Sequence, residues 1–363
     1  MTRWLSRLLP SDWDWPLLAA GLGLSCISLV GLSSAALVLD PMLAVKQGIW
    51  VAVGIFASLL VACVPYTRWI EIGVFIYPVV SLVLIVVLIA GTVKLGASRW
   101  ITVFGFSMQP SELAKLSSAC VVARYLSSHA QPISTRAALT SAVLAGVPAL
   151  LIFLQPDLGT ATIFAAIWFG AAWSAGMPSL LLKLGTAAMA VVLPCGWFLL
   201  KDYQRARLMV FVNPNVDPLG AGYTIIQSRI AIGSGQLFGR GWRAGTQAHL
   251  NFLPERHSDF LYSVVGEEWG FIGSVLVVAL FGLLIWRGTR LAADNSDVQG
   301  RALAMGLTSW IAYQAIINMG MVMGVVPVVG VPLPFMSYGG SAMVTTWIAL
   351  GILQSTRRFR TRF

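Results

Sequence analysis

Ten long apolar runs, separated by short polar segments, constrain this chain more than any other feature of its sequence. Several runs are about 17–24 residues long, enough for a helix to cross the roughly 30 Å hydrocarbon core of a bilayer. Only 10% of the residues are charged, whereas soluble domains carry about a quarter. A bilayer must therefore be the solvent for most of the surface. The runs lie approximately at residues 16–38, 47–64, 70–91, 111–127, 138–154, 158–176, 179–200, 263–286, 302–324 and 339–355.

This pattern predicts an all-α, polytopic membrane protein with about ten transmembrane helices. We expect one membrane domain over residues 1–363, because most of the chain consists of predicted spans and the length rule for soluble domains does not apply to it. The run at 111–127 is the weakest, since Glu112 and Lys115 interrupt it.

The basic residues predict that both termini lie in the cytoplasm. If the N-terminus is placed there and the runs alternate, the cytoplasmic side receives thirteen of the 24 Lys and Arg residues. The short outer loops receive only Lys46, Lys94 and Arg99, which is the asymmetry that membrane insertion favours. The net charge of +10 thus has an explanation in membrane orientation, and we expect no nucleic-acid partner. The thirteen are Arg3, Arg7, Arg68, Arg124, Arg136, Lys183, Arg287, Arg290, Arg301, Arg357, Arg358, Arg360 and Arg362.

One long segment, residues 201–262, separates the seventh run from the eighth and is predicted to face outward. Connections of that length usually serve a function. Within it, residues 223–232 alternate between apolar and polar character. They could form an amphipathic helix in the membrane interface or a cap on the bundle, and both interpretations stay open.

Charges inside apolar runs are costly and need an explanation. Glu112 and Lys115 are three residues apart, so they share a helical face and can pair. They form either a structural ion pair or the lining of a polar cavity that opens to the outer leaflet, with Gln109 just before Pro110 at the helix start. Asp157, in a short outer turn, either caps the next helix or projects into the same cavity.

The segment from Phe252 to Phe260 is the sharpest candidate for chemistry. Glu255 and Asp259 are four residues apart and could share a helical face. Asp259 stands at the outer end of the eighth run, where a carboxylate can stay ionised yet shielded enough to act as a base. His257 lies off that face and fits packing or hydrogen bonding better. For Glu267 and Glu268, two turns deeper, we favour a role as buried structural carboxyls.

Irregular backbone is predicted before the last run, where Pro332, Pro334 and the Gly339–Gly340 pair surround Ser337. Such backbone at membrane depth is tolerated where it lines a cavity or is enclosed by protein. Close helix packing is the alternative interpretation. No cluster of metal ligands stands out in the sequence.

Five separated blocks carry a resemblance to a known family, the SEDS proteins (shape, elongation, division and sporulation). The chain resembles this family over nearly its whole length, and within it the RodA group more than the FtsW group. The blocks, in the order of the chain, are Arg99–Trp100 with Gln109–Lys115, Gln155–Thr160, Asp217–Gly241, Phe252–Phe260 and Pro332–Ser341.

The resemblance implies a peptidoglycan glycosyltransferase in the bacterial cytoplasmic membrane. Such proteins polymerise lipid II, a disaccharide-pentapeptide on undecaprenyl pyrophosphate, during cell elongation. They work with a class B penicillin-binding protein and the elongation machinery. A lipid II flippase, a division protein of the FtsW group and a scaffold that only recruits a synthase are the alternatives.

The hypothesis for the mechanism is an inverting glycosyl transfer with Asp259 as general base. The departing pyrophosphate needs positive charge, which Lys115, a loop arginine or a divalent cation (Mg or Mn) could supply. The sequence does not rank the arginines. The residues expected in the substrate cavity are Arg99, Gln109, Glu112, Lys115, Asp157, Arg205, Arg207, Arg229, Glu255 and Ser337.

Overall fold

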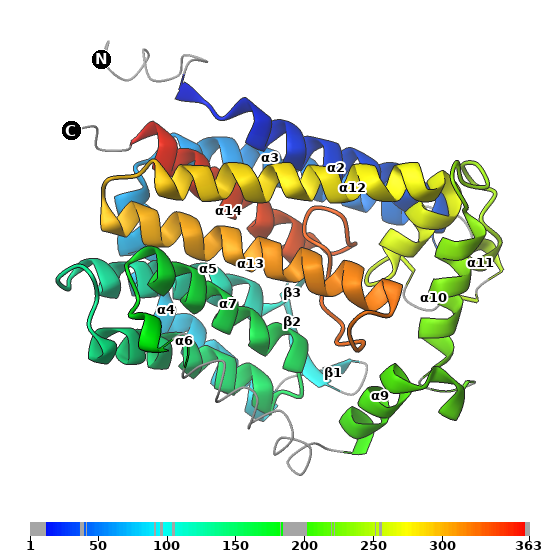
Figure 1. The fold of residues 1–363 in the computed structure, drawn as a ribbon, viewed down its shortest axis with the longest axis horizontal. Helices are drawn as coiled ribbons and strands as arrows, with labels where there is room; N and C mark the ends of the chain where they lie inside the picture. Colours follow the sequence, from blue (N-terminus) through cyan, green and yellow to red (C-terminus); the bar gives the residue numbers. More distant parts are fainter. Residues whose placement is uncertain are drawn as a thin grey trace.

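Long helices that run roughly parallel form the body of the molecule (Figure 1). The computed structural model describes residues 12–36, 40, 42–90, 92–94, 97–103, 106–181, 183, 202–218, 220, 222–250, 252–253 and 256–359. Within these ranges the long helices are α2 (Trp15–Ala35), α3 (Met42–Ala62), α4 (Tyr66–Ala90), α5 (Pro110–Ser127), α6 (Thr135–Leu154), α7 (Leu158–Ser174), α12 (Leu261–Ala293), α13 (Val298–Met323) and α14 (Gly340–Arg358). The all-α prediction is confirmed, and each of these helices coincides with a predicted apolar run. The remaining run, 179–200, lies almost entirely outside the described residues.

Five of the described helices, α2, α3, α4, α6 and α12, are long and apolar enough to cross a membrane. Their outward side chains are large and apolar, as at Phe75 (76% exposed) and Ile89 (80% exposed), so a hydrocarbon solvent suits this surface. The apolar helix α7 is shorter. Helices α5, α13 and α14 carry more polar residues and bury most of their side chains within the bundle.

The start of α2 and the end of α14 lie at the same end of the bundle (Figure 1). The opposite end carries the described part of the 201–262 segment. It contains α9 (Asp202–Val212), a 3-10 turn (Pro214–Val216), α10 (Tyr223–Ser234) and the short α11 (Thr246–His249). This arrangement agrees with an even number of crossings, and the assignment of the two ends to membrane sides stays a prediction.

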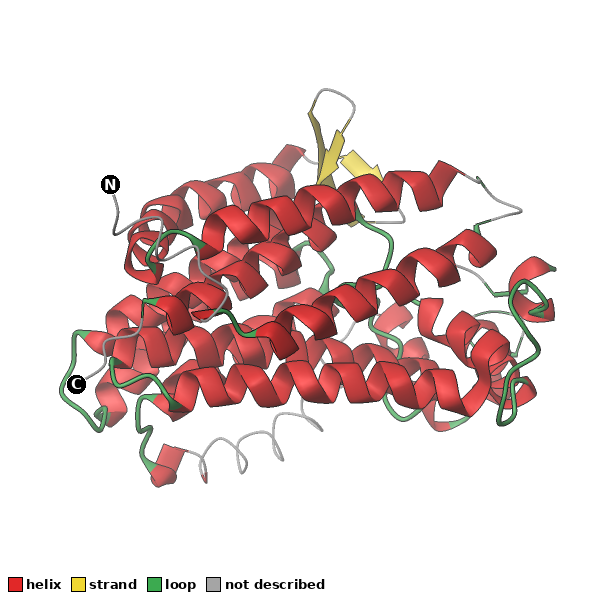
Figure 2. Cartoon of the chain, turned by 90° about the horizontal axis from the view of Figure 1, so that it is seen from above, coloured by secondary structure: helices red, strands yellow, loops and turns green. Residues whose placement is uncertain are grey.

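Three short antiparallel strands project from one side of the helical bundle (Figure 2). They are β1 (Thr92–Lys94), β2 (Ala97–Val103) and β3 (Phe106–Met108), in the order β1-β2-β3. Thr102 pairs with Ser107, and the last strand leads directly into α5. The sequence analysis did not predict these strands. They are three to seven residues long, and they lie in the connection between the apolar runs 70–91 and 111–127.

Helix α12 is interrupted at Gly270, whose φ of +66° is outside the helical range. The loop after α10 fills the interruption with its own backbone. Arg240 N and Gly241 N donate to the carbonyls of Glu267 and Glu268, both at 3.0 Å. On the other side of the break, Phe271 N donates to Gln236 O at 2.8 Å. The backbone groups freed by the break are thus satisfied by the outer loop, which fixes the loop to α12.

Helix α10 caps the bundle through its buried face. Ser228 Oγ lies 2.9 Å from Ser263 Oγ on α12 and donates to Val322 O on α13 at 2.6 Å. The cap interpretation of residues 223–232 is therefore confirmed. A position in the membrane interface stays a prediction.

Asp14 joins three helices at the end of the bundle that holds both termini. Its carboxylate accepts hydrogen bonds from Arg287 Nε on α12 (3.0 Å) and from Arg357 Nη1 on α14 (2.6 Å). It also caps α2, because it accepts a bond from Leu17 N at 3.1 Å. Burial alone raises the pKa of Asp14, but the bonds from Arg287, Leu17 N and Arg357 outweigh it and hold the pKa below its ordinary range.

We expect Asp14→Asn to destabilise the protein by about 1.5–3 kcal/mol, because both arginines lose a charged acceptor while the helix cap is kept. A carboxyl with a depressed folded pKa stabilises the fold above its unfolded pKa and loses that effect as the pH falls through the folded value. The difference in melting temperature between wild type and variant should therefore shrink below about pH 4. Asp40→Asn, at an exposed ion pair with Lys46, is the matched control and should leave the melting temperature unchanged. A constant difference between wild type and Asp14→Asn down to low pH would contradict the prediction.

Candidate functional site

Asp259 lies in the turn directly before α12, at the end of the bundle that carries α10 (Figure 1). Its side chain is partly exposed. The connection between α13 and α14 passes close to it at Gly330, which has a φ of +68°. A Cβ atom on Gly330 would lie 3.6 Å from Asp259 Oδ2, so this backbone forms one wall beside the carboxylate. The predicted base is thus accessible and lies against a loop.

The connection between α13 and α14 is irregular, as the prolines and glycines predict. Ser337 ties its turn together, because its hydroxyl accepts a bond from Leu333 N at 2.7 Å. Gln47 on α3 braces the same turn from the other side, donating to Ser337 O at 3.1 Å and accepting from Gly339 N at 3.4 Å. The loop is therefore enclosed by protein, as irregular backbone at membrane depth requires.

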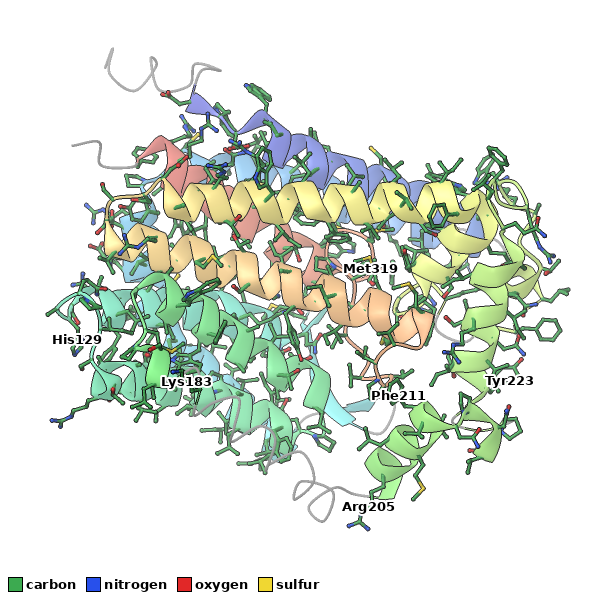
Figure 3. All side chains as sticks on the ribbon, in the orientation of Figure 1. His129, Lys183, Arg205, Phe211, Tyr223 and Met319 are labelled. Carbon is green, nitrogen blue, oxygen red and sulfur yellow. The ribbon has the colours of Figure 1, made fainter. Side chains whose placement is uncertain are left out.

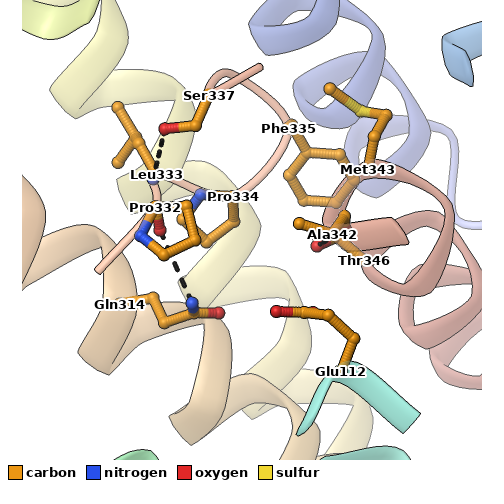
Figure 4. Close-up of a pocket in the computed structure, with 10 residues that line it drawn as sticks. All are labelled: Glu112, Gln314, Pro332, Leu333, Pro334, Phe335, Ser337, Ala342, Met343 and Thr346. Carbon is orange, nitrogen blue, oxygen red and sulfur yellow. Dashed lines mark hydrogen bonds between the residues drawn. The ribbon is translucent and has the colours of Figure 1, made fainter. Parts of the chain in front are cut away.

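A small cavity of about 10 Å³, room for about one water molecule, lies between this loop and helices α5, α13 and α14 (Figure 4). Glu112 and Gln314 point toward each other across its lower side (Figure 4). Ser337 also lines it, as predicted for a cavity residue. The lining residues are Glu112, Gln314, Pro332, Leu333, Pro334, Phe335, Ser337, Ala342, Met343 and Thr346.

Glu112 and Lys115 form the buried ion pair that their spacing predicts, with 2.8 Å between Lys115 Nζ and the carboxylate. Both side chains are at most 3% exposed. Thr345 Oγ1 on α14 donates to Glu112 Oε2 at 2.9 Å, and Lys115 Nζ lies 4.6 Å from the centroid of the Trp310 ring on α13. The ion-pair interpretation is confirmed. Glu112 also lines the small cavity, and a polar cavity that opens to the outer leaflet stays a prediction.

Asp157 caps α7, which confirms one of its two interpretations. Its carboxylate accepts bonds from Thr160 N (3.1 Å) and Thr160 Oγ1 (2.9 Å). It also interacts electrostatically with Lys115, although it is not among the residues that line the pocket. The structure thus brings Glu112, Lys115 and Asp157 into one charged neighbourhood.

The structure describes the side chains of two of the four predicted arginines, Arg205 and Arg229. Arg205, on α9, points away from the bundle (Figure 3). Arg229, on α10, is exposed and donates to Met323 O at 3.4 Å, at the end of α13. The side chains of Arg99 and Arg207 lie outside the part of the chain that the structure describes.

The other two predicted cavity residues are Glu255 and Gln109. Glu255 lies outside the described residues. Gln109 occupies the N-cap position of α5, but its side chain makes no capping hydrogen bond. Its role in the cavity stays a prediction.

Glu267 and Glu268 are buried structural carboxyls, as favoured from the sequence. Glu267 Oε1 accepts bonds from Gln247 N (3.0 Å) and Thr246 Oγ1 (3.2 Å), and Glu268 accepts one from Ser34 on α2. His257 packs edge-on against Tyr338, with 5.9 Å between the ring centroids. This contact fits the packing role expected for His257.

The carboxylates of Glu112 and Asp157 are engaged by other groups. Glu112 pairs with Lys115, and both oxygens of Asp157 bind Thr160. Among the residues that the structure describes, no three His, Cys, Asp or Glu side chains gather to hold a metal ion.

Sequence reasoning missed four uncharged polar residues of the site. They lie inside or beside apolar runs, where only charges were considered. A buried amide or hydroxyl in such a run also needs a hydrogen-bond partner, so amides spaced four residues apart on one helix were a usable signal. The four are Gln47, Gln314, Asn318 and Thr345.

Comparison with known proteins gives consistent matches. The family model of FtsW, RodA and SpoVE, described as cell cycle protein, matches residues 15–362. The peptidoglycan glycosyltransferase MrdB of Escherichia coli is 40% identical over 314 residues, which cover 85% of this chain and 84% of that protein. The probable peptidoglycan glycosyltransferase FtsW of Halothiobacillus neapolitanus is 39% identical over 320 residues, covering 85% of this chain and 76% of that protein.

The fold is shared as well. A solved chain of a peptidoglycan synthase complex, studied for the coordination of polymerization and crosslinking, superposes with a TM-score of 0.82. That chain is 30% identical, and the match covers 96% of this chain and 99% of that one. The resemblance inferred from the five sequence blocks is confirmed: this multi-pass membrane protein belongs to the FtsW/RodA/SpoVE family of cell cycle proteins.

Proposed function

We propose that this protein is a peptidoglycan glycosyltransferase of the bacterial cytoplasmic membrane that polymerises lipid II into glycan strands. Asp259 carries the proposal. It is a partly exposed carboxylate at the end of the bundle that carries the long 201–262 segment. The carboxylates of Glu112, Asp157, Glu267 and Glu268 are at most 3% exposed and are engaged by neighbours. A general base must reach its substrate, and Asp259 meets that requirement best among these carboxylates.

In the proposed reaction, Asp259 takes the proton from the 4-hydroxyl of the acceptor sugar. The oxygen attacks the anomeric carbon of the donor, forming one C–O bond while the bond to the lipid pyrophosphate breaks. A single displacement inverts that carbon. The pyrophosphate leaves with both bonding electrons, and cationic groups at the outer end stabilise it. Arg229 is one described candidate, because it is exposed on α10 and contacts the end of α13.

The lipid tail of such a substrate explains the architecture. A chain of isoprene units stays in the hydrocarbon phase, while the sugars lie at the water-facing end with Asp259. The pocket beside Glu112 and Ser337 is too small for a whole lipid-linked disaccharide.

The proposed biological role is cell elongation, in partnership with a class B penicillin-binding protein that crosslinks the product. Resemblance of residues 245–260 to the RodA group supports elongation over division. The match to a chain of a synthase complex supports the partner. Relatives of both groups are almost equally similar to this chain, so the division role is the alternative to be tested.

The test is polymer formation in detergent. Purified protein, alone and with its transpeptidase partner, is given lipid II in micelles, and glycan strands are separated by gel electrophoresis. A glycosyltransferase makes polymer there, whereas a flippase has no sealed compartment to act across and makes none. A scaffold makes none either, with or without the partner. Absence of polymer in both reactions, from protein that is folded and monodisperse, would sink the proposal.

A further inference from the structure

Three consecutive backbone carbonyls around Asp259 are each held by a donor from elsewhere in the chain. This is unusual for a turn, whose carbonyls normally face water or the following helix. The bonds run from Tyr338 N to His257 O (2.9 Å), from Ser337 Oγ to Ser258 O (2.6 Å) and from Asn318 Nδ2 to Asp259 O (3.0 Å). The backbone that carries the proposed base is therefore fixed at three successive residues.

Asn318 is the central element of this arrangement. It lies on α13 and is completely buried. Besides Asp259 O, its Nδ2 also donates to Val331 O at 2.7 Å. Both amide hydrogens are thus used, and they join the turn of Asp259 to the loop that passes beside its carboxylate. A buried amide is costly unless it is bonded, so this residue type at this depth indicates a specific role.

Asn318 is the last of three polar residues spaced four apart on one face of α13. Trp310 Nε1 donates to Gln314 Oε1, and Gln314 Nε2 donates to Pro332 O at 3.5 Å. The first of the three, Trp310, lies under the ammonium group of Lys115. We call Trp310, Gln314 and Asn318 the α13 ladder. Gln314 and Asn318 bind adjacent carbonyls, Pro332 O and Val331 O, so the loop backbone completes the connection from the buried ion pair of α5 to the backbone of Asp259.

We propose that Asn318 is a positioning residue that sets the orientation of Asp259 for proton transfer, and that the α13 ladder ties this position to the Glu112–Lys115 pair. The proposal rests on the proposed function, in which Asp259 is the base. Asn318 touches only backbone, so it acts through Asp259 and has no contact of its own with the substrate. Proton transfer needs heavy atoms about 2.6–3.2 Å apart, so a small displacement of the turn costs rate more than binding.

The experiment compares steady-state polymerisation of lipid II by wild type, Asn318→Leu and Asn318→Asp, each purified as the full chain with its partner. Asn318→Leu removes the donors at similar volume. Asn318→Asp keeps the shape but presents oxygen atoms to two carbonyls. Both variants should lower kcat by about 10- to 100-fold, the loss that a displacement of about 1 Å produces, with KM changed less than about twofold. Thr308→Val is the control, because Thr308 is buried on α13 but bonds only to Ala304 O of its own helix.

Two results would overturn the proposal. The first is a kcat within about twofold of wild type for both Asn318 variants in folded form. The second is an additive loss in the double variants with Asp259→Asn, because a residue that acts through Asp259 should add nothing once the base is gone. If Asn318→Leu does not fold, Ser337→Ala, which releases Ser258 O, is measured in the same way with the same expectation. If Asp259→Asn itself polymerises at the wild-type rate, the proposed function of Asp259 fails first, and the two failures are thereby distinguished.

Discussion

Asp259→Asn is expected to lower the rate of glycan polymerisation by about 10²- to 10⁴-fold, the usual contribution of a general base. The amide has the same shape as the carboxylate but cannot take the proton of the acceptor hydroxyl. In wild type and variant alike, the side chains of Asn318 and Ser337 donate hydrogen bonds to backbone carbonyls of the turn, so the fold should be unchanged. Lipid II binding, measured directly on the purified protein, should stay within about threefold of wild type.

Asp40→Asn is the control for this experiment. Asp40 is an acidic residue in the connection between α2 and α3, paired with Lys46 at the surface. Its substitution should leave polymerisation unchanged. Wild-type rates from Asp259→Asn would exclude Asp259 as the base, and a loss of lipid II binding would instead assign it to substrate recognition.

The second large effect is expected at the buried ion pair. Lys115→Met leaves Glu112 as an uncompensated charge in a buried site, which should cost about 3–5 kcal/mol of stability. The double variant Glu112→Gln/Lys115→Met removes both charges at similar volume, so most of that stability should return. Polymerisation should not return, because Glu112 lines the pocket beside the loop of Ser337.

The Arg68–Glu71 pair on α4 provides the matched control. It has the same spacing as Glu112–Lys115, but its side chains are 71% and 62% exposed. Arg68→Met should change the melting temperature little, since exposed pairs contribute little to stability. Recovery of both stability and activity in the double variant would mean that the Glu112–Lys115 pair only holds helices together.

The sequence predicted the helices well because the bilayer requires long apolar segments that satisfy their own backbone hydrogen bonds. A run such as 70–91 has to be a helix to satisfy its backbone in hydrocarbon, and α4 (Tyr66–Ala90) coincides with it. The break in α12 left no such signal. Gly270 sits inside the predicted run 263–286, and the outer loop docks where the helix is interrupted.

The site was predicted where charge marked it. Spacing alone gave the Glu112–Lys115 pair, and the short outer turn gave the cap at Asp157. Asn318 and Gln314 escaped because they carry no charge, and only charges were treated as costly inside the apolar runs. Their importance depends on which carbonyls they meet, at Asp259 and Pro332, and those carbonyls are brought near only by the folded loop between α13 and α14.

The loop of residues 236–241 docks at the break in α12 through its main-chain atoms. Its amides and carbonyls at residues 236–241 make the bonds, while Phe238 is 75% exposed and Trp242 54% exposed. Gly239 is sterically confined, since a Cβ there would lie 2.0 Å from Glu268 O. The outward face of this loop can therefore change its chemical character over evolutionary time without moving the scaffold beneath it. Sequence changes on this outward face therefore leave the geometry around Asp259 unchanged.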